Sequence, residues 1–309
     1  MEIRLISLGS VERIESGIVA CIGYFDGFHK GHQSLFNATL HNAKVKNLQS
    51  AIITFDPDPW VTIKGIDRKE VPHISTMEDR QRWAEDMGFD YFLMLDFTKE
   101  MATLSPSEFL ESIIRPLHVN YLVCGYDFHF GYKGSGNVET LRQADLFEVE
   151  EIEEIQYLEE KISSTRISNA IMHGNMELTQ ALLGRPYTLH GKVIHGRKKG
   201  REIGFPTANI QLEGNYIVPK VGVYLGKIQV HNHTYITVIS FGYNPTFNHQ
   251  DHVSIEAHIL DFQEKIYDES ITLGIYQYIR NEQKFETIQQ LQQAITQDCI
   301  IARSYFKEN

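Results

Sequence analysis

The sequence predicts an α/β protein of two domains, with a parallel sheet in the N-terminal domain and an antiparallel β-structure in the C-terminal domain. At 309 residues the chain is longer than most single domains, and 42% of it is hydrophobic, which is enough for two cores. Short apolar runs alternate with helical patterns over about the first 150 residues, whereas strand-like segments separated by turns dominate near the C-terminus. This change of pattern sets the expected domains at residues 1–184 and 185–309.

The N-terminal domain shows four apolar segments typical of buried strands and three segments with helical spacing. Strands that alternate with helices predict a parallel sheet with right-handed crossovers. Ligands bind such sheets at the carboxyl ends of the strands. The expected strands are residues 18–25, 51–55, 91–97 and 121–128, and the expected helices are residues 31–46, 76–87 and 106–114.

The C-terminal domain shows five strand-like segments with turn residues between them, which fits a compact antiparallel barrel or sandwich. The chain then returns to helical spacing, because apolar residues from Phe285 to Cys299 recur on one side. We therefore expect a β-domain with a terminal helix. The expected strands are residues 189–195, 222–230, 235–240, 253–260 and 271–279, and the expected helix is 285–306.

The overall charge and the cysteines exclude several classes of protein. The formal net charge of −11 and the isoelectric point of about 5.7 argue against general binding to nucleic acids or membrane surfaces. Cys21, Cys124 and Cys299 form no CxxC pair, so we expect no disulfide framework, and the apolar runs around Cys21 and Cys124 predict small buried thiols. The sequence shows no signal peptide pattern and no apolar run of about 18 residues. We expect a cytoplasmic protein.

The segment GYFDGFHKGH (residues 23–32) begins at a predicted strand end and runs into a predicted helix. Its glycines allow the backbone to approach a phosphate closely, and helix N-terminal amides favour negative charge there. His29 and His32 would face the same side of the first turn and donate hydrogen bonds as charge builds at phosphorus. A zinc pair is the alternative, but no cysteine or carboxylate lies nearby at metal-site spacing. The segment predicts phosphate chemistry.

A second glycine-rich segment is GKVIHGRKKGREIGFPTAN (residues 191–209). Gly196, Gly200 and Gly204 suggest a loop whose backbone wraps a ligand. The basic run at 197–201 adds local positive charge inside an acidic protein, although such a run alone is also typical of a solvated loop.

The N-terminal motifs carry a family resemblance. Residues 23–32 resemble the nucleotidyltransferase superfamily signature. Together with TFDPDP (54–59), GYDFHFG (125–131) and ISSTRI (162–167), they resemble motifs of bacterial bifunctional riboflavin kinase/FMN adenylyltransferases, or FAD synthetases. The resemblance implies a Rossmann-like nucleotidyltransferase sheet for this half of the chain.

The C-terminal motifs extend the resemblance. Residues 191–209 look like the ATP loop of riboflavin kinases, and GYNPTF (242–247) and IEAHILDF (255–262) follow in the family order. The resemblance runs from about residue 18 to about residue 298, and it implies a riboflavin-kinase β-barrel with a terminal helix.

In the N-terminal half, the resemblance implies that His29 and His32 act in catalysis on the ATP phosphates. Ser164 and Thr165 would contact the same phosphates from the start of a helix, where hydroxyl groups can both cap and donate. The full nucleotide set is Gly23, Phe25, Asp26, Gly27, Ser164, Thr165 and Arg166, and the flavin side is Asp127 and Phe128.

In the C-terminal half, the resemblance implies that Thr207 and Asn209 hold a Mg²⁺ ion, a hard cation that prefers oxygen ligands. Glu256 would be the general base that takes the proton from the ribityl 5′-hydroxyl. The remaining implied contacts are Gly196, Gly200 and Gly204 with the nucleotide and Arg280 with the flavin.

The resemblance implies an enzyme that uses ATP to phosphorylate riboflavin and then to adenylylate FMN, with no nucleic-acid or membrane partner. Three alternatives stay open: an enzyme with one degenerate module, a flavin-binding regulator, and an adenylyltransferase for another metabolite. Intact His29, His32 and Glu256 disfavour the regulator, and the kinase-like half disfavours the other metabolite. The chain departs from common family residues at Asp58, Asp127, Ser168, Ser240 and Asp268.

Overall fold

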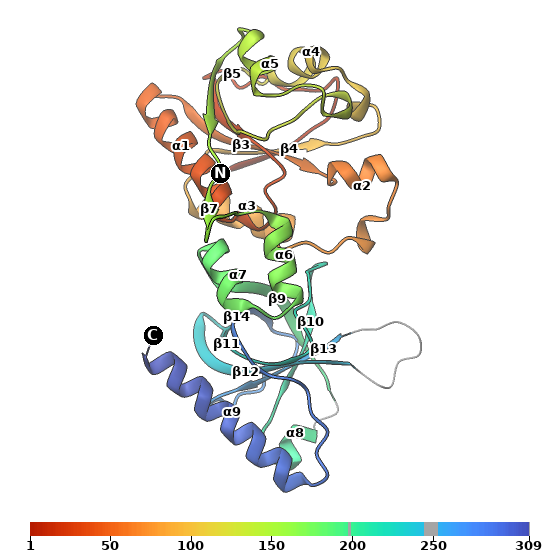
Figure 1. Ribbon diagram of the computed structural model, residues 1–309, viewed down its shortest axis with the longest axis vertical. Coiled ribbons are helices and arrows are strands. Elements are labelled where there is room, and N and C mark those ends of the chain that lie inside the picture. Colours follow the sequence, from red (N-terminus) through yellow and green to blue (C-terminus); the bar gives the residue numbers. More distant parts are fainter. Residues whose placement is uncertain (197–198, 244–252, 309) are drawn as a thin grey trace. The chain divides into compact units, whose positions relative to one another are not determined.

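The computed structural model describes residues 1–196, 199–243 and 253–308 (Figure 1). The chain divides into two compact units, Met1–Ser164 and Thr165–Asn309. The first is an α/β structure and the second is a β-barrel with helices, and each has its own core. Among the described residues, no helix is both long and apolar enough to cross a membrane.

The first unit is built on a six-stranded parallel sheet in the order β1-β4-β3-β2-β5-β6. The order reverses at β2, because β3 pairs with one side of it and β5 with the other. In open α/β sheets, the crevice at such a reversal is the usual ligand site. The strands are β1 (Glu2–Ile6), β2 (Ile18–Ile22), β3 (Gln49–Asp56), β4 (Tyr91–Asp96), β5 (Val119–Gly125) and β6 (Glu148–Ile152).

Both faces of this sheet are covered, which explains why β2 and β3 are buried along nearly their whole length rather than on alternate residues. Cys21, Ile52 and Phe92 face one core with Phe36 of α1, whereas Ala20, Ile53 and Leu93 face the other.

The helices of this unit are α1 (Lys30–Lys46), α2 (Pro59–Lys64), α3 (Met77–Asp86), α4 (Pro106–Phe109) with the π-turn Leu110–Ile114, and α5 (Val138–Gln143). Short 3-10 turns are Asp26–Phe28, Arg68–Glu70, Met101–Thr103 and Tyr132–Gly134. The short strands β7 (Gln156–Tyr157) and β8 (Glu160–Lys161) pair with each other.

The sequence predicts β2, β3, β4 and β5 but not the two edge strands. β6 reads EVEEI and is only partly buried, so its glutamates hide the strand pattern. β1 reads EIRLI and leaves Ile3 and Leu5 exposed at the sheet edge. Charged side chains are common on edge strands, where they discourage pairing with other chains.

The second unit is a closed antiparallel barrel in the order β10-β13-β12-β11-β14-β9, which confirms the expected barrel over a sandwich. Helix α9 covers β11 and β12, so the expected terminal helix is also confirmed (Figure 1). Residues 244–252, which include the last four positions of the GYNPTF motif, lie outside the described part of the chain. The elements are β9 (Tyr187–Ile194), α8 (Lys199–Glu202), β10 (Ala208–Leu212), β11 (Gly222–Val230), β12 (His233–Tyr243), β13 (Val253–Ile259), β14 (Ser270–Arg280) and α9 (Ile288–Glu308).

Helices α6 (Ser164–Met172) and α7 (Met176–Leu183) group mainly with the barrel unit, although the sequence places them before a boundary at 184. Helix α7 contacts β9 and β14, and the side-chain amide of Gln180 donates to the Tyr276 carbonyl at 2.6 Å. The change in sequence pattern at 184–186 therefore marks the end of α7 rather than the division between compact units.

Candidate active sites

A cavity of about 580 Å³ opens in the first unit at the carboxyl ends of β2 and β5. Its walls are mostly aromatic and aliphatic, with a few polar groups, which is the usual composition of a small-molecule site. The loops that follow the two strands carry both N-terminal motifs, so the sheet brings together residues about 100 positions apart. The predicted residues that line it are Gly23, Phe25, His29, His32, Asp127, Phe128 and Ser164.

His29 and His32 lie side by side at the start of α1. His29 caps the helix, because its Nδ1 accepts a hydrogen bond from the His32 backbone amide at 3.3 Å. The two imidazole rings are stacked with centroids 3.5 Å apart, and the edge of Phe25 packs against His32. His29 is only 5% exposed. Both rings line the cavity, as the HxGH spacing predicts.

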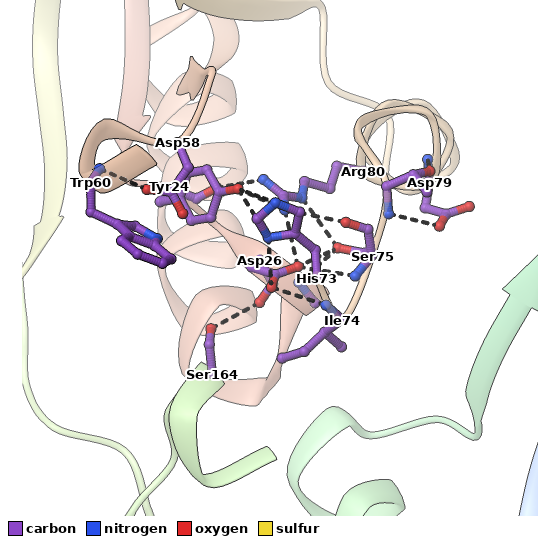
Figure 2. A network of polar contacts seen from close by, with 12 residues as sticks. Tyr24, Asp26, Asp58, Trp60, His73, Ile74, Ser75, Asp79, Arg80 and Ser164 are labelled. Atoms are coloured by element: carbon purple, nitrogen blue, oxygen red, sulfur yellow. Dashed lines mark hydrogen bonds and ion pairs between the residues drawn. The ribbon is translucent and has the colours of Figure 1, made fainter. Parts of the chain in front are cut away.

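Asp26 and Gly27, which the sequence assigns to the nucleotide, are not among the residues that line the cavity. The Asp26 carboxylate accepts from the backbone amides of Ile74 and Ser75, both at 3.0 Å, and forms an ion pair with Arg80 at 3.0 Å (Figure 2). Burial alone would raise the pKa of Asp26, but the Arg80 charge and the His73 hydrogen bond outweigh it and lower the pKa to about 2. The carboxylate is therefore held in its ionised form inside the protein.

Ser164 reaches the same loop from the first residue of α6. Its hydroxyl donates to the Asp26 carbonyl at 3.1 Å (Figure 2). Thr165 and Arg166 follow it as the first residues of the second compact unit, where Thr165 is exposed and Arg166 is half-buried.

The far end of the cavity carries the predicted flavin residues. Phe128 stacks on Phe130 with centroids 5.7 Å apart and nearly parallel planes. Asp127 forms an ion pair with Lys161, and the Lys161 ammonium lies 4.9 Å from the centre of the Tyr126 ring. Asp127, which differs from the common family residue, thus has its negative charge paired with the Lys161 ammonium. Lys161 also lines the cavity, and its position just before the ISSTRI motif is the signal that sequence reasoning missed.

The departure at Asp58 has a local structural explanation. Its carboxylate caps α2 by accepting from the Trp60 amide at 2.9 Å, and the side chain is buried (Figure 2). Burial raises the pKa of this carboxyl above its usual range. The neighbouring Pro59, rather than Asp58, lines the cavity.

A second group of predicted residues lies on the outer face of the barrel. Asn209 of β10 is directly opposite Glu256 of β13, and Ser240 of β12 is opposite Glu256 on its other side. Directly opposed residues of antiparallel strands point to the same face. Thr207 donates from its hydroxyl to a Glu256 carboxylate oxygen at 3.1 Å. The structure therefore brings Thr207, Asn209 and Glu256 together, as the motifs predict.

Two glycines of the glycine-rich segment lie close to this group, Gly196 beside Asn209 and Gly200 beside Thr207. A Cβ at Gly196 would lie 2.1 Å from the Asn209 amide nitrogen, so a larger residue here would displace the Asn209 side chain. Gly200 falls in α8, and Gly204 has a φ of 83°. Arg197 and Lys198 of the basic run lie outside the described residues. Thr207 also lines a cavity of about 340 Å³ next to the barrel.

Asp268, one of the family departures, adopts a left-handed φ of 65°, a conformation that glycine adopts without strain. The Asp268 amide donates to the Val193 carbonyl of β9 at 2.8 Å, so this backbone stays bonded to the barrel.

Arg280 is engaged with the terminal helix. Its guanidinium binds Asp298 of α9 through two nitrogens, at 3.0 Å from Nε and 2.7 Å from Nη2. The Asp298 side chain is 4% exposed, so this pair ties α9 to β14. The flavin contact predicted for Arg280 stays a prediction.

Comparisons with known proteins match each half of the chain to a family. The family described as FAD synthetase matches residues 11–166, and the family described as riboflavin kinase matches residues 183–306. A bifunctional riboflavin kinase/FMN adenylyltransferase of Listeria monocytogenes is 40% identical over 290 residues, covering 93% of this chain and 92% of the relative. The Bacillus subtilis protein of the same description is 38% identical over 295 residues, with 93% and 92% covered.

A solved structure also spans the chain. A crystal structure from Streptococcus pneumoniae, described as a macrolide-efflux protein, superimposes with a TM-score of 0.89. It is 31% identical and covers 97% of this chain and 98% of its own. The complete architecture of both units therefore occurs in a chain that has been solved by crystallography.

Proposed function

Because the chain belongs to the family of bifunctional riboflavin kinase/FMN adenylyltransferases, we propose that it makes FAD from riboflavin in two ATP-dependent steps. The first step yields FMN and ADP, and the second yields FAD and pyrophosphate. We assign the second step to residues 1–184 and the first to residues 185–309. The observation that supports this most is that both family matches coincide with a separately assembled group of polar residues.

For adenylyl transfer, an oxygen of the FMN phosphate attacks the α-phosphorus of ATP, and the bond to pyrophosphate breaks. His29 and His32 line the cavity side by side and are suited to donate to the phosphate oxygens as charge builds. Ser164 lines the cavity at the first residue of α6, where helix N-terminal amides favour the negative charge of a phosphate, and Gly23 and Phe25 also line the cavity. Thr165 and Arg166 keep their proposed nucleotide contacts, whereas the Gly27 amide is bonded to Ser75 and Gly27 does not line the cavity. Asp127 and Phe128 take the proposed flavin side.

For phosphorylation, the ribityl 5′-hydroxyl oxygen attacks the γ-phosphorus of ATP and ADP leaves. Glu256 accepts the hydroxyl proton, and its carboxylate is already positioned by the Thr207 hydroxyl at 3.1 Å. The side-chain oxygens of Thr207 and Asn209 are hard donors that fit Mg²⁺. When bound there, Mg²⁺ would neutralise charge on the nucleotide phosphates. Gly196, Gly200 and Gly204 let the backbone approach the nucleotide.

The three cysteines are free thiols, and free thiols are typical of proteins in a reducing compartment. This supports a cytoplasmic location for the proposed reactions.

A chromatographic time course tests the proposed function. The purified chain is mixed with ATP and Mg²⁺, together with riboflavin in one reaction and FMN in a second. Formation of FMN and then FAD in the first reaction is expected. FAD only in the second reaction would mean a degenerate kinase module, and FMN only in the first would mean a degenerate transferase. No product in either reaction would favour a flavin-binding regulator.

Replacing one histidine separates the two activities. His32→Ala should lower FAD formation by about a hundredfold, because a donor to the charged phosphate is lost. FMN should still accumulate from riboflavin. His41→Ala removes an exposed histidine from the same helix and serves as the matched control. Undiminished FAD formation by His32→Ala would exclude the role given to this pair.

A further inference from the structure

The loop between β2 and α1 has an unfavourable backbone conformation. Phe25 and Phe28 adopt left-handed φ angles of 57° and 43°, and both side chains are buried. Bulky residues rarely adopt this region, and such conformations persist only where surrounding contacts over-determine them. Gly27, between them, has a φ of 79°, and a Cβ there would lie 2.8 Å from Ile74. This loop delivers His29 to the cavity.

Arg80 of α3 supplies much of the constraint on this loop. Its side chain is 2% exposed, and its three nitrogens reach different partners (Figure 2). Nη1 donates to the Tyr24 carbonyl at 3.1 Å, Nη2 to the Asp26 carboxylate at 3.0 Å, and Nε to the Ser75 hydroxyl at 3.1 Å. A planar guanidinium can donate to all three partners at once, whereas the ammonium of a lysine concentrates its donors on one nitrogen.

Ser75 connects Arg80 to the glycine at the centre of the loop. Its hydroxyl donates to Asp26 at 3.0 Å and accepts from the Gly27 amide at 2.8 Å and from Arg80 (Figure 2). One donor and two acceptor sites are all that a serine hydroxyl offers, so its hydrogen-bonding capacity is filled.

The Asp26 carboxylate is similarly committed to the protein. One oxygen accepts from the Ser75 amide, the Ser75 hydroxyl and Arg80, and the other accepts from the Ile74 amide. Asp26, Ser75 and Arg80 are not part of the described cavity lining. The backbone carbonyl of Asp26, however, accepts from Ser164, which does line the cavity. The network thus contacts both segments that flank the site.

We propose that Arg80 and Ser75 are positioning residues for adenylyl transfer, and that Asp26 acts with them rather than by contact with the nucleotide. They fix the strained backbone from Tyr24 to Phe28, and this backbone sets the placement of His29, His32 and Ser164 around the ATP phosphates. This inference rests on the proposed function of the first unit.

The test compares FAD formation from FMN in Ser75→Ala and Arg80→Lys with the wild-type chain. Both variants should lose about tenfold in kcat, because a displacement of about 1 Å at reacting groups has effects of this size or larger. The KM for FMN should stay within about twofold of wild type. The rate of riboflavin phosphorylation by the same variants should also stay within about twofold. Both tryptophans of the chain, Trp60 and Trp83, lie in the first unit, so their fluorescence reports whether it is folded.

Ser50→Ala is the matched control, because Ser50 is another buried serine of the same unit whose hydroxyl donates to a carboxylate, Asp90, at 2.9 Å. Ser50→Ala should lower the unfolding midpoint as Ser75→Ala does, but its kcat for FAD formation should equal that of the wild-type chain. Full activity in Ser75→Ala or Arg80→Lys would overturn the proposal, and so would an equal loss of kcat in Ser50→Ala. Absence of FAD with the wild-type chain would instead refute the proposed function.

Discussion

At the scale of single residues, buried polar side chains serve different purposes. His29 and His32 line the cavity, whereas Asp26 and Arg80 form an ion pair inside the protein. The histidines were predictable, because they are three positions apart and a helix start brings them together. The ion pair was not predictable, because 54 positions separate its members and no local pattern links them.

Asp26 should make the stability of the first unit depend on pH. Its folded pKa of about 2 lies below the ordinary value of 3.8, so ionised Asp26 stabilises the fold fully above about pH 4. This contribution, about 2 kcal/mol, is lost as the pH falls through 2. The difference in unfolding free energy between wild type and Asp26→Asn should therefore shrink from pH 5 towards pH 2. Urea unfolding followed by tryptophan fluorescence measures it.

The matched control is Asp86→Asn, which removes an exposed carboxylate from the same unit. A difference between wild type and Asp26→Asn that stayed constant over this pH range would contradict the linkage.

At the scale of elements, helix α3 is fixed at its N-terminus by a capping box. The Thr76 hydroxyl accepts from the Asp79 amide at 3.1 Å, and the Asp79 carboxylate accepts from the Thr76 amide at 3.0 Å. Arg80 follows directly, so the cap sets where the guanidinium enters the core. The sequence predicts this helix within one residue at each end, because its cap and its spacing are local features.

Removing the cap should weaken the unit measurably. Thr76→Ala should lower the unfolding free energy by about 1 kcal/mol, since the Asp79 amide loses its partner. Chemical denaturation at neutral pH measures this change. Glu78→Gln alters an exposed residue of the same turn and should stay within about 0.5 kcal/mol of wild type. Equal stabilities of wild type and Thr76→Ala would show that the cap is redundant.

Elements that depend on tertiary pairing were harder to predict. The inner strands of the sheet are visible as apolar runs, because both of their faces are buried. β10 was missed although it carries Asn209, since only three of its five residues are apolar and it follows the glycine-rich loop directly. Its identity as a strand comes from pairing with β9 and β13.

At the scale of the whole molecule, the chain contains two compact units, and each assembles a group of candidate site residues. The sequence motifs were sufficient for the fold class and for the order of the two halves, because each motif is short and complete in itself. They were insufficient for the division at residue 164, which depends on the contacts of α7 with the barrel.

Separate units predict separable activities. Glu256→Gln should lower FMN formation from riboflavin by about a hundredfold or more, because an amide cannot take the hydroxyl proton. FAD formation from added FMN should be unchanged. The two rates are measured by chromatography, with Glu213→Gln, an exposed glutamate of the same unit, as the control. FMN formation at the wild-type rate would exclude Glu256 as the base.

The closure of the barrel has a further consequence for Glu256. Side chains alternate along β13, so a slide by one residue would turn Glu256 inward and an apolar neighbour outward. Because β13 is bonded to β10 on one side and β12 on the other, such a slide would have to break two ladders. Inserting or deleting a single residue within β13 should therefore abolish phosphorylation, although every amino acid needed for the reaction would still be present.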